Sequence, residues 1–314
     1  MLKYLIRRIL SAIPVLFGIT IIDYVIMSLA GNPLSMIQTA KVTKAAVEAK
    51  KAALGLDQPV YMQYLTWLKN LLHGNMGYSL QSYEPVSKII GSHIAPTLLL
   101  MGVSLLIGFA IAIVFGVYAA VHKNEKTDYA IVTVSFLGIS IPNFFLALIL
   151  IYIFTIRLHI LPSSGMTTQG TGANVSDTIV HMIMPVIVLS SYIAGSNIRY
   201  VRSSVLEILQ KEYLITAKAK GIGQRKMILV HALKNALIPI ITVLGMQIPV
   251  LFGGAVIVEQ IFGWPGLGLI TMNAILQRDY PVIMGVCLMT AIVVLAANLI
   301  TDLIYALVDP TIQY

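Results

Sequence analysis

Residues 199–239 read RYVRSSVLEILQKEYLITAKAKGIGQRKMILVHALKNALIP, and this stretch determines how the rest of the chain is interpreted. The 36 residues from Arg199 to Lys234 hold eight Lys or Arg and two acidic residues, and they lie between two long apolar runs. One Lys or Arg at the centre of a bilayer helix costs about 2.5–3.5 kcal/mol, so eight would cost roughly 20–28 kcal/mol. We therefore predict that this stretch does not cross a membrane and is a cytoplasmic loop, residues 199–235.

The composition around this loop is that of an all-α integral membrane protein. Of the 314 residues, 58% are hydrophobic and 11% are charged, whereas about 25% are charged in soluble domains. Crossing a hydrocarbon layer of about 30 Å takes about 20 apolar residues. Six runs meet that length and predict six transmembrane helices within one domain, 1–314: Ile9–Ala30, Thr97–Val121, Ala130–Ile156, Ile179–Val201, Ala236–Val258 and Val282–Val308.

The distribution of basic residues predicts the orientation. With the N-terminus inside, 13 of the 21 Lys and Arg fall on the cytoplasmic side: three near the N-terminus, two between the second and third spans, and eight in the long loop. Because basic residues are retained on that side, both termini are predicted to be cytoplasmic. The net charge of +8 is thus a topology signal, and nucleic-acid binding, which calls for base-stacking aromatics beside a basic patch, is not expected.

Residues 31–95 form the one sizeable segment predicted outside the membrane on the outer side. They are expected to hold two short helices, over 44–54 and over 61–73, each ending before a glycine. The second has an apolar stripe at helical spacing. This stripe is compatible with a helix lying on the membrane surface or on the helix bundle, and also with a contact to a ligand.

The second predicted span carries a small residue at every fourth position. These are Ser104, Gly108, Ala112, Gly116 and Ala120. Such spacing places the small side chains on one face, where a neighbouring helix can approach closely. The neighbour belongs either to this chain, which is the simpler expectation, or to a second subunit.

Few polar side chains are candidates for chemistry within the spans. Asp23 is an acid inside the first span, where it either faces a polar cavity or reaches the outer interface. The six histidines show no helical pairing, so no metal site is predicted. The single cysteine, Cys287, is interpreted as a packing residue of the last span.

Within the long loop, the pattern predicts a helix, a tight turn and a second helix. An apolar stripe is followed by a face of small residues, and glycines then end the helix. The residues are Val205, Leu206, Leu209 and Tyr213 for the stripe, Ala217 and Ala219 for the small face, and Gly221 and Gly223 for the stop. Without further information, a solvated basic loop is an equally good interpretation.

The run YLITAKAKGI at 213–222, followed by HALKNALIP at 231–239, resembles the cytoplasmic-loop signature of ABC-importer permeases of the dipeptide, oligopeptide and nickel family. Further segments resemble the same family in the same order: LAGNP at 29–33, LGLDQPVYMQYLTWL at 54–68, SIPNFFLA at 140–147, HMIMP at 181–185, VEQIFGWPGLG at 258–268, RDYPV at 278–282 and DP at 309–310. The resemblance covers nearly the whole chain.

This resemblance implies a six-helix type I importer permease that forms half of a translocation path for di- or oligopeptides. It implies four kinds of partner: a second related permease, two cytoplasmic ATPase subunits, an external substrate-binding protein, and the lipid of a bacterial or archaeal cell membrane. It assigns coupling to the ATPase to Tyr213, Thr216, Ala217, Lys218, Ala219, Lys220, Gly221, Ile222 and Gly223. Pro142, Asn143 and Asp23 are the candidates for the translocation path.

The chain departs from the family pattern at a few positions. Ile215 stands where the general permease motif has Glu, and Asn32 and Asn75 stand where the family often has Asp. Asp23 is not a family residue at its site. These departures do not change the resemblance to the permease family. They concern how the translocation path closes on its outer side.

The sequence also bears on what the chain itself catalyses and carries. No GxxxxGK[ST] loop occurs, so ATP and Mg²⁺ are expected on the partner ATPases, and the chain is expected to be a non-catalytic subunit. Nickel or a metal chelate is the alternative substrate within the family. An ion-coupled secondary carrier is the alternative from another class, although it would need more intramembrane ionisable residues.

Overall fold

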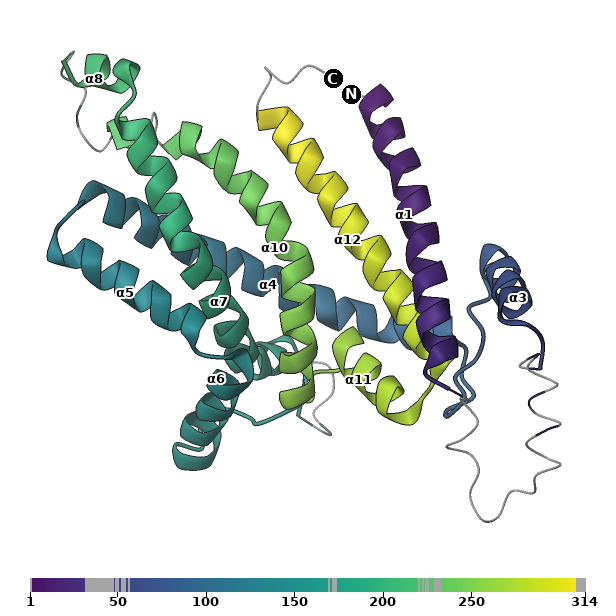
Figure 1. Ribbon diagram of the computed structural model, residues 1–314. Coiled ribbons are helices and arrows are strands. Elements are labelled where there is room, and N and C mark those ends of the chain that lie inside the picture. Colours follow the sequence, from purple (N-terminus) through teal and green to yellow (C-terminus); the bar gives the residue numbers. More distant parts are fainter. Residues whose placement is uncertain are drawn as a thin grey trace. The chain divides into compact units, whose positions relative to one another are not determined.

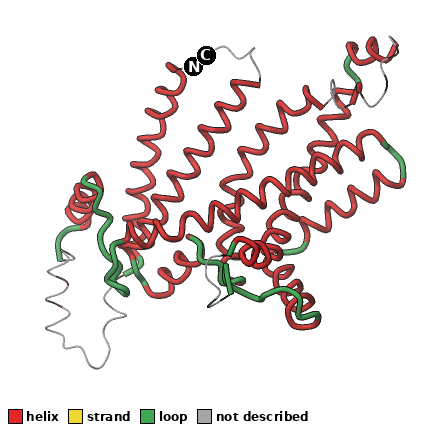
Figure 2. The backbone as a smooth tube through the Cα atoms, turned by 180° about the vertical axis from the view of Figure 1, so that it is seen from behind, coloured by secondary structure: helices red, strands yellow, loops and turns green. Residues whose placement is uncertain are grey.

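The computed structural model describes the backbone of residues 2–31, 48, 51, 55, 57–168, 170, 174–219, 221, 223, 226–228 and 233–308. Within these ranges the regular structure is helical, and extended residues pair at a single isolated bridge between Tyr78 and Pro85. Figure 1 labels the helices, and Figure 2 shows the same backbone from behind. The predicted all-α class is confirmed.

Two compact units make up the chain, and neither is a continuous stretch of sequence. The first consists of Met1–Ala95 and Gly266–Leu295, and the second of Pro96–Pro265 and Ala296–Tyr314. The first unit contains α1 (Leu2–Leu29), α3 (Val60–Leu72) and α11 (Leu267–Gln277). The second contains α5 (Lys126–Ser140), α6 (Asn143–Leu150), the π-helix η2 (Ile151–Arg157), α7 (Val175–Leu209), α8 (Glu212–Ala219) and α10 (Leu233–Ile261). Residues of α4 (Val86–Val121) and α12 (Tyr280–Val308) belong to both units.

Four helices among the described residues are long and apolar enough to cross a membrane. They are Ile6–Leu29 within α1, the whole of α4, the whole of α7, and Tyr280–Leu303 within α12. They match the first, second, fourth and sixth predicted spans. The predicted fifth span falls within α10, and the count of six spans stays a prediction.

The third predicted span, Ala130–Ile156, is not one continuous helix. It consists of α5 followed by α6 and η2, with a bend of 96° between the two parts. The cause is local: Pro142 lacks an N–H and disfavours the helical conformation in the residue before it. Accordingly, Ile141 is extended, with φ −82° and ψ 118°. A bend of this size makes the segment a broken span or a re-entrant loop.

The small residues of α4 face α7 of the same chain, as the simpler expectation had it. A Cβ atom on Gly108 would lie 2.7 Å from the Cβ of Ile193, and one on Gly116 would lie 2.7 Å from the Cβ of Val201. Ser104, Ala112 and Ala120 are also buried. The two helices therefore pack at a distance that larger side chains do not permit.

Gly116→Val is expected to lower the free energy of unfolding by about 2–3 kcal/mol, since overpacking a fixed interface strains it. The new Cβ would lie 2.9 Å from the carbonyl oxygen of Ile198, a backbone atom that cannot rotate away. Unfolding of the purified protein in detergent measures the effect. Gly102→Val in the same helix is the control, because a Cβ there meets no atom of the described residues within 4 Å. Equal stability of the two variants would contradict the close α4–α7 packing.

In the first unit, α3 packs on α1 through aromatic side chains. Tyr64 lies edge-on to Tyr24 with ring centroids 5.5 Å apart, and its hydroxyl is 3.0 Å from the hydroxyl of Thr20. Gln63 accepts a hydrogen bond from the hydroxyl of Tyr24. The helix predicted over 61–73 is thus confirmed as α3, whereas the one predicted over 44–54 lies outside the described residues apart from isolated positions.

A buried apolar cluster and a pinned loop complete the first unit. The cluster consists of Val86, Ile90, Leu267, Ala274, Val282, Ile283 and Val286, and Cys287 packs against it, which confirms its packing role. The buried carboxylate of Asp279 accepts hydrogen bonds from the hydroxyl of Ser79 and from the N–H of Leu80, the latter at 3.0 Å. These bonds fix the loop after α3 to the start of α12.

Candidate coupling region and translocation segment

The long helix α7 ends at Leu209, where two residues separate it from α8 (Figure 1). The N–H groups of Gln210 and Lys211 bond to carbonyls three residues back, at 3.2 Å and 3.0 Å, which tightens the last turn and ends the helix. The predicted apolar stripe from Val205 to Tyr213 is therefore not on one helix, and in this respect the prediction was wrong. Val205 lies on α7, and Tyr213 lies on α8.

The eight residues of α8 hold most of the residues assigned to coupling. Leu214 is buried, whereas Tyr213 is 48% exposed and Thr216 is exposed. The Thr216 hydroxyl donates to the carbonyl of Glu212 at 3.0 Å within the helix. One side of α8 is thus fixed to the protein, and another side, with Tyr213 and Thr216, is open.

The glycine stop after α8 is present as predicted. Gly221 has φ +78°, a left-handed conformation that a residue with a Cβ adopts at a cost, and no atom of the described residues lies within 4 Å of the position of an added Cβ. Gly223 is exposed. Ala217, Lys218 and Ala219 belong to α8 by their backbone, and their side chains lie outside the description, as do Lys220 and Ile222 entirely.

A largely buried ion pair joins α7 to α5 about two helical turns before the end of α7. The guanidinium of Arg202 donates from Nε to Oδ1 of Asp128 at 2.6 Å and from Nη2 to Oδ2 at 2.7 Å. Asp128 also accepts from the N–H of Asn124 at 2.9 Å, and its side chain is 3% exposed. Two parallel bonds fix direction as well as distance, so the pair holds the α4–α5 turn against α7.

Further contacts make α5 and α7 a stiff pair. The guanidinium carbon of Arg199 lies 4.4 Å from the centre of the Phe136 ring. A Cβ on Gly195 would lie 2.7 Å from the carbonyl oxygen of Ser135, so the two backbones nearly touch there. Because α8 follows α7 after two residues, α8 is linked through α7 to α5.

The bend before α6 places Asn143 beside two other helices. A Cβ on Gly254 of α10 would lie 3.3 Å from Nδ2 of Asn143 and 3.6 Å from a methyl group of Leu189 on α7. Asn143 is half-buried and Pro142 is exposed. Asp23 is half-buried on α1, in the other unit. The structure thus brings Asn143 to a junction of three helices in the second unit, whereas Asp23 belongs to the first.

The segment VEQIFGWPGLG contains buried polar groups that the sequence pattern did not reveal. The hydroxyl of Thr97 donates to Oε1 of Glu259 at 2.7 Å, and the indole Nε1 of Trp264 donates to the carbonyl of Pro96 at 3.0 Å. Glu259 and Trp264 are both fully buried. The predicted span ends at Val258 and so leaves Glu259 outside the membrane. The position of Glu259 in the family-like motif VEQIFGWPGLG is the signal that could have identified it as a buried structural residue.

The histidine of the HMIMP segment was also missed, because it was considered only as a metal ligand. His181 is buried, with Nδ1 3.2 Å from the carbonyl of Gly165 and Nε2 3.3 Å from the hydroxyl of Thr168. Its Nε2 is also 3.6 Å from Oδ1 of Asp177. The side chain therefore holds the loop after η2 on the first turns of α7.

Two family models match the chain, one over its N-terminal third and the other over the remainder. Residues 1–101 match the N-terminal part described as "Binding-prot-dependent transport system membrane comp", and residues 112–314 match "Binding-protein-dependent transport system inner membrane component". The chain is 43% identical over 316 residues to the oligopeptide transport system permease protein AppB of Bacillus subtilis strain 168, covering all of both chains. It is 35% identical over 315 residues to the glutathione transport system permease protein GsiC of Escherichia coli strain K12, again covering all of both.

The fold is similar to that of a solved transporter in inward-facing conformations. The match is to a chain of the MetNI methionine ABC transporter, with a TM-score of 0.59 and 21% identity, and it covers 70% of this chain and 96% of that one. The two family models together span nearly the whole sequence and determine the family of the chain. The chain belongs to the family of inner-membrane components of binding-protein-dependent transport systems, which are non-catalytic membrane-spanning subunits served by separate ATPase and substrate-binding subunits.

Proposed function

We propose that this chain is the permease subunit of an ATP-driven importer and forms half of the translocation path for di- and oligopeptides. The observation that carries the proposal is full-length similarity to an oligopeptide permease, at 43% identity. The relative that transports glutathione, itself a small peptide, supports the same substrate class. Nickel and metal chelates remain the alternative cargo within the family.

The proposed coupling element is α8 together with the turn at Gly221. In this proposal, Tyr213, Thr216 and the segment 217–223 dock on a cytoplasmic ATPase, and ATP and Mg²⁺ are bound by that subunit. Support comes from the open side of α8 and from its direct attachment to the α5–α7 pair. When the ATPases close, α8 is pushed, and α7 carries the displacement toward the membrane.

The proposed complex contains a second, related permease subunit, two ATPases and an external binding protein. The N- and C-termini are placed in the cytoplasm on the distribution of basic residues. Within this complex, Asp23, Pro142 and Asn143 are the candidates for contact with cargo. Asn143 has the strongest support, because it lies at the bend of the broken span, next to α7 and α10.

The cargo can be tested on the complex purified with its co-expressed ATPases and binding protein in lipid nanodiscs. ATP hydrolysis is measured with di- to pentapeptides and with nickel or nickel chelates. We expect peptides alone to stimulate hydrolysis. Stimulation by the metal species alone would establish the alternative cargo, and a permease that co-purifies with no ATPase would contradict the importer assignment.

A further inference from the structure

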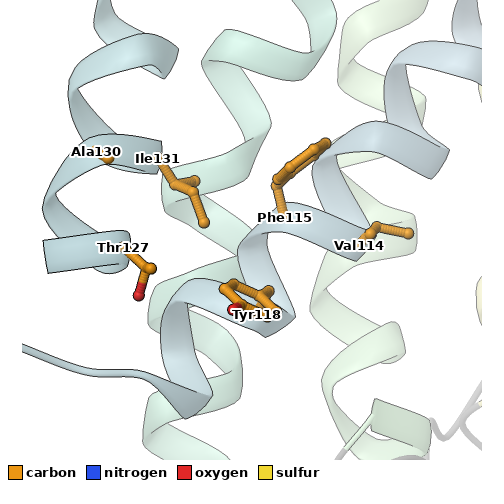
Figure 3. A pocket seen from close by; sticks show the side chains of 6 residues that line it. All are labelled: Val114, Phe115, Tyr118, Thr127, Ala130 and Ile131. Atoms are coloured by element: carbon orange, nitrogen blue, oxygen red, sulfur yellow. The ribbon is translucent and has the colours of Figure 1, made fainter. Parts of the chain in front are cut away.

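An apolar groove lies between α4 and α5, beside the turn that joins them (Figure 3). It has a volume of about 320 Å³. Its lining comes from one face of each helix and consists of Val114, Phe115, Tyr118, Thr127, Ala130 and Ile131. Figure 3 shows the side chain of Ile131 pointing from α5 toward Phe115 on α4. Tyr118 and Thr127 lie near the turn, and they line the groove with their carbon atoms and not with their hydroxyl groups.

The side chains of this groove are exposed on a helix that is long enough to cross a membrane. Val114 is 63% exposed, and Phe115 and Tyr118 are each 46% exposed. An apolar surface at this place is favourable in contact with hydrocarbon and costly in contact with water. Because it is hollowed, it can hold part of an acyl chain.

Two lysines stand at the end of the groove. The turn has the sequence HKNEK at 122–126, and Lys123 and Lys126 are both exposed. The ion pairs recorded among the described residues involve neither of them. Asp128 is close in sequence, but its two carboxylate oxygens are already bonded to Arg202 and to the N–H of Asn124. Glu125 is the other acid of the turn, so the two lysines leave it with a net positive charge.

We propose that the groove binds an acyl chain of an anionic phospholipid, with the net-negative headgroup of that lipid paired with Lys123 and Lys126. An apolar slot that opens next to two cations matches an amphiphile with a hydrocarbon tail and an anionic head. Cationic side chains at the membrane surface attract anionic headgroups. Each lysine or arginine there raises the binding constant for an anionic lipid about fivefold. The topology argued from the basic residues places this lipid in the cytoplasmic leaflet.

The test uses two photoactivatable lipids in phosphatidylcholine nanodiscs that hold the intact transporter complex. The probes are phosphatidylglycerol and phosphatidylcholine, each with the same diazirine-bearing acyl chain. Labelled peptides are identified by mass spectrometry. We expect phosphatidylglycerol to label the segments that contain Phe115 and Ile131 at least about fivefold more than phosphatidylcholine does.

Variants separate the headgroup contact from the tail contact. Lys123→Gln with Lys126→Gln should lower labelling by phosphatidylglycerol to the level seen with phosphatidylcholine, a decrease of at least about fivefold. Lys69→Gln with Lys88→Gln, two exposed lysines elsewhere, should leave it unchanged. Ala130→Trp should fill the groove and remove labelling, whereas Ala110→Trp, at an exposed alanine outside the lining, should not.

Three results would overturn the proposal. The first is equal labelling by the two lipids in the unmodified complex. The second is labelling that does not change when both lysines are replaced. The third is the absence of labelling of both segments by either lipid, which would show that acyl chains do not reach the groove.

Discussion

Gly221→Val is expected to reduce peptide uptake at least about tenfold while leaving membrane insertion and expression intact. Gly221 ends α8 with φ +78°, a conformation that costs an L-residue roughly 1–2 kcal/mol and a β-branched residue more. The strain shifts the turn away from the geometry that presents α8 to the ATPase. No atom of the described residues lies within 4 Å of the added Cβ, so we attribute the effect to the backbone and to the docking surface. Uptake of labelled peptide by whole cells measures it.

Gly221→Asn is the matched control for this substitution. Asparagine adopts the left-handed conformation more readily than other residues with a Cβ. We therefore expect it to retain a substantial part of the uptake. Uptake at the unmodified level by a well-expressed valine variant would remove the support for α8 as the coupling element. Equal loss in both variants would indicate that the side chain itself blocks docking.

Asp128→Ala is expected to lower the free energy of unfolding by about 3 kcal/mol. Breaking a buried ion pair by removing one partner costs about 3–5 kcal/mol, because the other charge is left without its counter-charge. The lower end of this energy range applies here, because the side chain of Arg202 is 23% exposed and water still solvates part of its charge. Unfolding of the purified protein in detergent measures the loss. ATP hydrolysis by the assembled complex should become less responsive to peptide, because α5 is no longer tied to α7 next to α8.

A double-mutant cycle isolates the pair from the rest of its surroundings. Asp128→Asn, Arg202→Gln and the two together are compared with the unmodified protein. We expect the double variant to be about 1–3 kcal/mol more stable than the sum of the single effects predicts. Additive effects would mean that the two side chains contribute independently, and that the bidentate contact does not hold α5 to α7.

Local chemistry explains which elements the sequence could predict. The end of α8 follows from two glycines after a helical pattern, and the close approach of α4 and α7 follows from a small residue at every fourth position. Each of these two patterns consists of residues that lie close together along the chain. A kink at Pro142 was expected, but a bend of 96° between α5 and α6 was not, because apolar composition alone was used to draw the third span. Pro142 carried the signal, since a proline forces the residue before it toward an extended conformation.

The contacts that order the candidate site were not predictable in the same way. Arg202 and Asp128 are 74 positions apart, and Thr97 and Glu259 are 162 apart. Spacing along one sequence indicates which residues share a helix face, but not which residues of two helices meet. The region of the coupling loop could therefore be located from the sequence, whereas the ion pair that stiffens its support required the fold.

The bond network of Asp279 has a consequence for how the protein is made. Its partner Ser79 precedes it by 200 residues. At a synthesis rate of about 5–20 residues per second, the ribosome needs roughly 10–40 seconds to add the intervening chain. During that interval the loop around Ser79 and Leu80 has already been translated but lacks the carboxylate that will hold it. The two segments of the first unit can therefore join only after the intervening part of the chain has been synthesised.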